Sequence, residues 1–176
     1  AAGCLHLLAG AFGSQRMRNC LLAFAAAFAA CSACSAGPWQ GVVTRVSDGD
    51  TLWVRPVNGG KPRKLRIDGI DAPEICQTWG EKSREALSSR VLNQTVLVQG
   101  RRKDSYDRTL ASLKFRGEDM GDWMVSRGYA WSYHYQRQVG PYPEQETQAR
   151  AARRGLFAHS PAIRPREFRR KHGPCQ

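Results

Sequence analysis

The stretch LRIDGIDAPE, residues 65–74, gathers one arginine and three carboxylates into ten positions. Apolar and polar residues alternate in its first half, which is the period of a half-buried strand. Strict alternation would send Arg66 and Asp71 to opposite faces of that strand. We therefore predict a bend or bulge near Asp68 and Gly69 that brings the two side chains to one site.

The sequence around this stretch has the pattern of short strands joined by tight turns. Strands are predicted at 41–46, 51–57, 63–70, 95–98 and 110–115, and an Asn-Gly pair at 58–59 is a strong hairpin signal. Helices are predicted at 81–92, 121–127 and 144–156. Five strands and about three helices in this order predict an α+β, mainly β fold: a five-stranded barrel of the OB type, whose open face is used for oligonucleotides.

Two further charged blocks flank the opening stretch, namely SDGDT at 47–51 and SYDRT at 105–109. Carboxylates bind a hard divalent cation through oxygen, and arginines hold phosphate oxygens in a planar bidentate fork. A single acidic loop is more often a solvated turn. Three blocks in this order indicate one metal-assisted phosphodiesterase site.

With DGDT at 48–51, RIDGIDAPE at 66–74 and YDR at 106–108, the chain resembles the staphylococcal (micrococcal) nuclease family, also called thermonucleases. The resemblance covers about residues 42–156. It implies a calcium-dependent endonuclease on an OB-fold barrel, which hydrolyses DNA and RNA to products with a 3′-phosphate. We expect a monomer that prefers single strands and uses no small-molecule cofactor.

The resemblance also implies a metal site. Asp50 and Asp71 match the family's calcium-binding aspartates, and Ala72 matches a position that binds calcium through its backbone carbonyl. A threonine is common in the family at the position of Ala72, but a main-chain contact should tolerate alanine. The other acids of these blocks, Asp48 and Asp68, are interpreted as structural.

Catalytic roles follow from the same resemblance. Glu74 matches the glutamate that positions or deprotonates the attacking water, and Arg66 and Arg108 match the arginines that bind the phosphate and stabilise its pentacoordinate transition state. The chemistry is sound in its own right, because a cation and two guanidinium groups aimed at the phosphate oxygens lower the barrier as charge develops.

Tyrosines near these blocks have two interpretations. Tyr106, Tyr133 and Tyr135 could stack on bases, which holds single strands without sequence preference. Aromatic residues of this kind also pack in barrel cores. The family has two tyrosines near Tyr133 and Tyr135 that touch the nucleotide, but this segment is one residue shorter here.

The formal net charge of +12 favours polyanionic partners. Attraction to the phosphate backbone fits nucleic acid, while an anionic membrane or cell-wall polymer would suit the same charge. The main rival to a nuclease is a noncatalytic OB-type module that binds nucleic acid, with the acids serving only loops.

Residues 1–36 have the pattern of a secretory signal peptide: they contain no acid and have an apolar run at 21–30 followed by small residues. We expect cleavage after Ala36 and export to the periplasm or outside the cell. In the alternative, Cys31 lies in a lipoprotein box and would anchor the domain to a membrane. Residues 1–16, ahead of Met17, are hypothesised to be an untranslated extension.

The mature chain divides into a nuclease domain at 37–160 and a basic tail at 161–176, which is expected to wrap or fray. Solvated arginines are the favoured interpretation of the tail. Removal of the leader leaves two cysteines, Cys76 and Cys175. In an oxidising compartment they could bridge the tail to the loop after Glu74, or they could remain two unpaired thiols.

Overall fold

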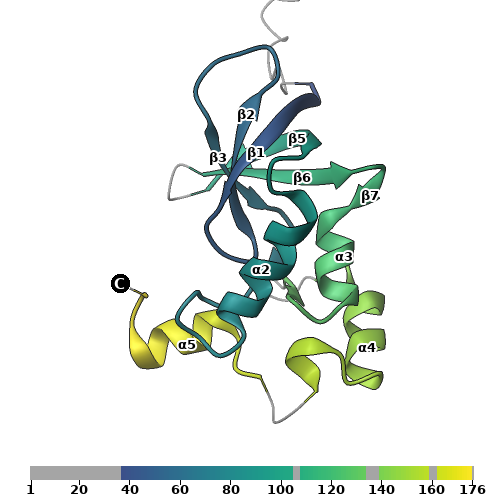
Figure 1. The fold of residues 1–176 in the computed structure, drawn as a ribbon. Coiled ribbons are helices and arrows are strands. Elements are labelled where there is room, and N and C mark those ends of the chain that lie inside the picture. The colour runs from purple at the N-terminus through teal and green to yellow at the C-terminus, as the bar shows by residue number, and fades with distance from the viewer. Residues whose placement is uncertain (1–36, 105–107, 134–138, 159–161, 176) are drawn as a thin grey trace, which may run out of the picture. The chain divides into compact units, whose positions relative to one another are not determined.

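A computed structural model describes residues 37–104, 108–133, 139–158 and 162–175 (Figure 1). Its strands are β1 (Trp39–Val46), β2 (Thr51–Pro56), β3 (Arg63–Ile67), β4 (Ile70–Asp71), β5 (Thr95–Lys103), β6 (Thr109–Phe115), β7 (Glu118–Asp119) and β8 (Trp131–Ser132). Its helices are α2 (Gly80–Val91), α3 (Met120–Ser126), α4 (Pro143–Ala151), the 3-10 turn η1 (Gly155–Phe157) and α5 (Pro165–His172).

Five strands close into a barrel. They are hydrogen-bonded in the order β3-β2-β1-β5-β6, and a parallel pairing of β3 with β6 completes the circle. Closure leaves these strands no long exposed edge. The predicted α+β, mainly β fold with a five-stranded OB-type barrel is thereby confirmed.

Alternating side chains of the barrel strands point inward and make the hydrophobic core. Leu52 and Val54 of β2 and Leu65 of β3 are almost completely buried. Leu87 and Val91, one turn apart on α2, join the same core. The helices lie towards one end of the barrel, and α5 lies on the opposite side of α2 from α4 in this view (Figure 1).

Several element boundaries differ from those predicted. The predicted strand at 63–70 is divided into β3 and β4, and the strand predicted at 95–98 continues to Lys103. The helix predicted at 144–156 ends at Ala151, because the chain turns through the positive φ angle of Arg153 and then of Gly155, the first residue of η1. The two-residue strands β4, β7 and β8 are too short to leave a periodic signal in the sequence.

The C-terminal segment is ordered as a helix, so of the two expectations for the tail, to wrap or to fray, fraying is wrong for residues 165–172. Pro165 occupies the first turn of α5, where its fixed φ suits a helix start. Basic residues fill the last turn, where they interact favourably with the helix dipole.

A disulfide joins this segment to the loop between β4 and α2. Cys76 and Cys175 are bonded with their Cα atoms 5.7 Å apart, so the bridged alternative holds and the free-thiol alternative does not. The bond closes a separation of 99 residues, which places the end of the chain beside the loop that follows β4.

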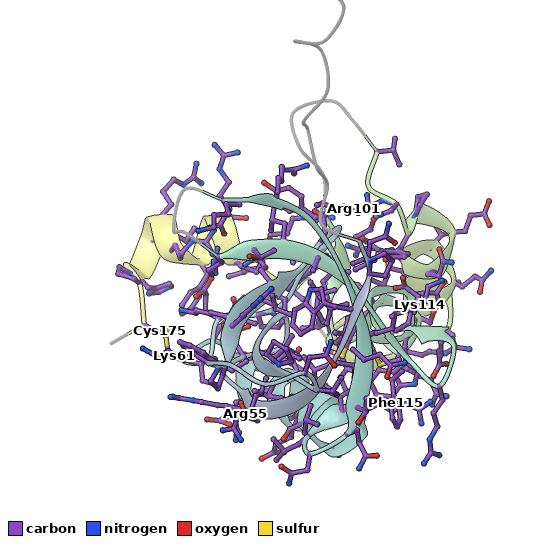
Figure 2. All side chains as sticks on the ribbon, turned by 90° about the horizontal axis from the view of Figure 1, so that it is seen from above. Arg55, Lys61, Arg101, Lys114, Phe115 and Cys175 are labelled. Carbon is purple, nitrogen blue, oxygen red and sulfur yellow. A yellow bond between two sulfur atoms is a disulfide. The ribbon has the colours of Figure 1, made fainter. Side chains whose placement is uncertain are left out.

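Basic side chains are spread around the outside of the barrel. Arg55, Lys61, Arg101 and Lys114 are exposed, on different strands and turns (Figure 2). In the described part of the chain, no helix is both long and apolar enough to cross a membrane. The predicted signal peptide at 1–36 lies outside the described residues.

Candidate active site

The strand that carries the acidic stretch is broken at Gly69. β3 ends at Ile67, Gly69 has a φ of 83°, and the chain resumes as β4 at Ile70. A Cβ atom on Gly69 would lie 2.4 Å from Cγ of Pro141, so the turn needs glycine for space as well as for conformation. The predicted break near Asp68 and Gly69 is confirmed.

Arg66 and two aspartates meet across this break. Pairing of β2 with β3 sets Thr51 opposite Arg66, which brings the adjacent Asp50 to the guanidinium. Nη2 of Arg66 lies 2.9 Å from Oδ2 of Asp50 and 3.0 Å from Oδ1 of Asp71. The backbone N–H of Ala72 donates to Oδ2 of Asp50 at 3.2 Å. These four predicted residues therefore form one group, the Asp50–Arg66–Asp71 cluster.

Burial controls the charge of this cluster. Asp50 is 3% exposed and Asp71 is 6% exposed. Burial, and then the charge of Asp50, raise the pKa of Asp71 to about 6, although Arg66 and Arg169 act to lower it. For Arg66, burial alone would lower the pKa, but the charges of the acids outweigh burial and raise it. The negative charges of the acids thus keep Arg66 protonated. The positive charge of Arg66 offsets only part of the effect of burial on the aspartates, so the pKa of Asp71 stays raised.

Asp48 adds a third carboxyl beside the cluster. It accepts a hydrogen bond from the backbone N–H of Asp50 at 2.9 Å, as expected of a structural turn residue. Burial, and then the charge of Asp50, raise its pKa to about 7. Three acids and one arginine therefore share this part of the protein.

The donor set fits a hard cation. In the described part of the chain, no three His, Cys, Asp or Glu side chains are gathered closely enough to hold a metal by themselves. The implied site uses only Asp50, Asp71 and a main-chain carbonyl, and the two carboxylates do meet here. The carboxylates of this site carry more negative charge than the single positive charge of Arg66 can neutralise, and such buried oxygen donors suit an ion such as calcium.

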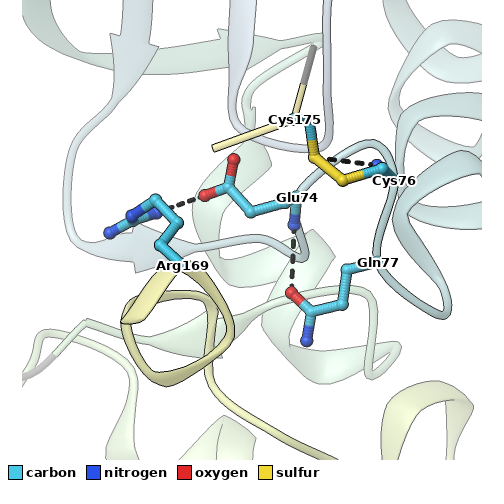
Figure 3. Close-up of a disulfide and its surroundings, with 5 residues drawn as sticks. All are labelled: Glu74, Cys76, Gln77, Arg169 and Cys175. Atoms are coloured by element: carbon cyan, nitrogen blue, oxygen red, sulfur yellow. Dashed lines mark hydrogen bonds and ion pairs between the residues drawn. A yellow bond between two sulfur atoms is a disulfide. The ribbon is translucent and has the colours of Figure 1, made fainter. Parts of the chain in front are cut away.

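Glu74 lies on the loop between β4 and α2, two residues after Ala72. Its backbone N–H donates to Oε1 of Gln77 at 3.2 Å, and its side chain is 26% exposed. The carboxylate is bound by Arg169 of α5 (Figure 3). Glu74 thus follows Asp71 and Ala72 on the same stretch of chain, and its carboxylate is held by the C-terminal helix α5.

Arg108 directly precedes β6, the strand that pairs in parallel with β3. Its Nε donates to Oδ2 of Asp104 at 2.8 Å and its backbone N–H donates to Oδ1 at 3.0 Å. The parallel pairing places the start of β6 beside the strand of Arg66, and Asp104 holds Arg108 there through a hydrogen-bonded ion pair.

Of the three predicted tyrosines, only Tyr133 is described. β8 pairs with β4, with Trp131 opposite Asp71, and the backbone N–H of Tyr133 donates to the carbonyl of Gly69 at 2.9 Å. Tyr133 is 39% exposed, whereas Trp131 is fully buried core. Tyr106 and Tyr135 lie outside the described residues.

Several supporting residues were not predicted. Thr51 donates to Oδ1 of Asp50 at 2.8 Å, and its place in the DGDT block was the available signal. Asp104 holds Arg108 and stands four residues before it. The sequence has no comparable signal for Gln77 or Arg169, because their partners depend on how the C-terminal segment packs.

The chain is similar to known proteins over most of its length. The model of the family described as staphylococcal nuclease homologue matches residues 64–159. An uncharacterized endonuclease of Haemophilus influenzae is 36% identical over 144 residues, which are 82% of this chain and 80% of the relative. A micrococcal nuclease of Shigella flexneri is 33% identical over 143 residues, 75% of this chain and 81% of the relative. The chain belongs to the staphylococcal nuclease family.

Proposed function

We propose that this protein is a calcium-dependent nuclease that hydrolyses the phosphodiester bonds of DNA and RNA and leaves 3′-phosphate products. The observation that carries the proposal is the Asp50–Arg66–Asp71 cluster, in which a guanidinium and two buried carboxylates are held at 2.9–3.0 Å. The nuclease names of the relatives support the same reaction class.

The roles divide between metal, phosphate and water. Asp50, Asp71 and the carbonyl of Ala72 would hold calcium, which supplies positive charge to the phosphate oxygens. Arg66 and Arg108 bind those oxygens and stabilise the charge that develops as the phosphorus becomes pentacoordinate. Glu74 orients the attacking water and accepts its proton. The water attacks phosphorus and the bond to the 5′-oxygen breaks, so that the phosphate stays on the 3′-oxygen and the 5′-oxygen takes up a proton from solvent and leaves as a hydroxyl.

Digestion of denatured DNA tests this function. We expect cleavage with calcium, none with EGTA, and a loss of turnover of at least about 100-fold in Glu74→Gln and in Arg66→Ala. Glu85→Gln, on an exposed face of α2, and Arg55→Ala, on β2, are matched controls that should cut normally. Cleavage that needs neither calcium nor Glu74 would refute the mechanism. Tight binding without cleavage would favour the noncatalytic module.

A preference for single strands is part of the proposal. Tyr133 is exposed and anchored to the Gly69 carbonyl beside the cluster, where its ring could stack on an unpaired base. We expect Tyr133→Ala to raise KM for a single-stranded oligonucleotide and to leave kcat close to that of the unmodified protein. Tyr133→Phe is the control that keeps the ring.

We propose that the protein acts after export, as a monomer in the periplasm or outside the cell. The Cys76–Cys175 disulfide supports an oxidising compartment, where such bonds persist. The leader-like pattern at 1–36 agrees with export. Mass spectrometry of the mature N-terminus tests the proposal, since cleavage after Ala36 and acylation at Cys31 give different masses.

A further inference from the structure

The C-terminal segment 162–175, here called the strap, is fastened to the loop that carries Glu74. Nε2 of Gln77 donates to the carbonyl of Ile163 at 2.6 Å, Arg169 binds Glu74, and Cys175 is bonded to Cys76. The backbone N–H of Cys76 also lies 3.1 Å from Sγ of Cys175. Three of the four residues from Glu74 to Gln77 therefore hold the strap directly.

Gln77 couples the strap to the backbone of Glu74. Its Oε1 accepts the Glu74 N–H at 3.2 Å while its Nε2 donates to Ile163, and the residue is 8% exposed. A buried amide that is satisfied on both sides has little freedom to move. The position of the Glu74 backbone is thus linked to the position of the strap (Figure 3).

The strap is anchored at its other end as well. Nη2 of Arg164 lies 3.2 Å from Oε1 of the buried Glu146, and Nη1 donates to the carbonyl of Ser132 at 3.4 Å. The expectation that the tail arginines are simply solvated is therefore wrong for Arg164 and Arg169. The match to the family model covers residues 64–159, so the strap lies outside the matched residues while its partners lie within them.

Arg169 contacts one oxygen of the Glu74 carboxylate. The contact is to Oε1, and Figure 3 shows the other oxygen turned away from Arg169. A glutamate side chain has several rotatable bonds, and an exposed one samples several rotamers. A guanidinium on one oxygen restricts that motion and leaves the second oxygen to receive a proton.

We propose that Arg169 is a positioning residue for hydrolysis, held by the disulfide-bonded strap so that it fixes the Glu74 carboxylate for the attacking water. This inference rests on the proposed function of Glu74. The strap is then a part of the active site that is supplied from the other end of the domain, and the Cys76–Cys175 bond acts on turnover through Arg169.

Steady-state kinetics on a short single-stranded fluorescent oligonucleotide with calcium test the proposal. We expect Arg169→Ala to lower kcat by about 10- to 100-fold, as for a misplaced reacting group, with KM within about twofold of normal. Arg169→Lys should recover part of kcat, because it keeps the charge but not the fork. Arg170→Ala removes the same charge from an exposed position of α5 and should leave kcat unchanged.

The paired Cys76→Ser and Cys175→Ser change tests the role of the disulfide. We expect it to lower kcat in the otherwise unmodified protein. In the Arg169→Ala background it should lower kcat little further, because both changes remove the same positioning of Glu74. Melting temperatures identify any variant that fails to fold. If Arg169→Ala is such a variant, the partial recovery of kcat expected in Arg169→Lys tests the role of Arg169.

Three outcomes would overturn the inference. They are a normal or raised kcat in Arg169→Ala, a rise in KM alone, and an equal loss in Arg170→Ala, each of which makes Arg169 something other than a positioning group. Cleavage that is calcium-dependent but insensitive to Arg169 overturns this inference alone. Failure of the unmodified protein to cleave overturns the proposed function and this inference with it.

Discussion

Arg66 and Asp71 are joined by a 3.0 Å hydrogen bond from Nη2 to Oδ1, although they stand five positions apart on what would otherwise be one strand. The bond exists because β3 ends at Ile67 and the backbone turns at Gly69 before β4 begins. The geometry of the proposed metal and phosphate sites therefore depends on one backbone turn.

Gly69→Ala should disturb both stability and activity. The substitution forces a left-handed φ on alanine and drives its Cβ to 2.4 Å from Pro141, so we expect a loss of about 1–3 kcal/mol and weaker turnover. Gly59→Ala is a matched control, because Gly59 has a φ of 94° but open space around it. Urea unfolding and DNA digestion measure the two effects. Normal stability in Gly69→Ala would refute the requirement for glycine.

Without calcium, stability should fall as pH rises from about 4 to 7. The folded-state pKa values of Asp71 and Asp48 are raised to about 6 and about 7 from the 3.8 of free aspartate. A raised carboxyl pKa means that the folded protein binds more protons than the unfolded chain, so its stabilisation is complete below pH 3.8 and is lost as pH rises through 6–7.

The loss should be several kcal/mol, because each pKa unit corresponds to about 1.36 kcal/mol and the coupling of these acids to Asp50 and Arg66 keeps the total below the simple sum of the two shifts. Urea unfolding in EGTA across this pH range measures it. Asp48→Asn should flatten the slope, because it removes the carboxyl with the larger shift. Saturating calcium should offset the loss at pH 7, since it binds the ionised carboxylates. Stability that rises with pH in EGTA would contradict the prediction.

Glu146 connects the site to α4 and to the strap. Its buried carboxylate accepts the backbone N–H of Ser132 at 2.9 Å and pairs with Arg150 and Arg164. Ser132 lies opposite Ile70 in the β4–β8 pairing, next to Asp71. We expect Glu146→Ala to cost about 3–5 kcal/mol, because it leaves buried donors and a cation without their acceptor.

The urea midpoint of Glu146→Ala measures this loss. Glu144→Ala removes an exposed acid from the first turn of the same helix and should cost well under 1 kcal/mol. Equal losses of stability in the two variants would show that the buried contacts of Glu146 do not stabilise the fold.

The sequence predicted what depends on local pattern and on short motifs. Apolar alternation was enough for the barrel strands, and the conflict between that alternation and a shared site for Arg66 and Asp71 predicted the break at Gly69. The grouping of Asp50, Arg66, Asp71 and Ala72 followed the motif blocks, because β2–β3 pairing sets the two blocks side by side.

The contacts of the C-terminal segment could not be predicted. Arg169 and Glu74 are 95 residues apart, and an arginine in a basic run has the same local pattern whether it is solvated or paired. Cys76 and Cys175 could be named as candidates, but the distance that permits a bond comes only from the fold. β4 and β8 pair over two residues, which no periodic pattern reveals.

Arg66→Ala should separate calcium binding from turnover. Arg66 bridges Asp50 and Asp71, so its loss leaves two buried carboxylates facing each other without a counter-charge and should cost about 3–5 kcal/mol in EGTA at pH 7. The same loss removes a cation that competes with calcium for those oxygens, so calcium affinity should be kept or increased. Turnover should still fall by at least about 100-fold, because the transition state loses a phosphate donor.

Titration calorimetry with calcium and single-turnover digestion measure the two effects in the same variant. Arg55→Ala, an exposed arginine on β2, should change neither. If calcium affinity and turnover fell together in Arg66→Ala, the guanidinium would be a structural element of the metal site. If turnover falls while calcium affinity is kept or increased, the guanidinium acts on the phosphate. A group that is needed only in the transition state affects turnover without contributing to metal binding.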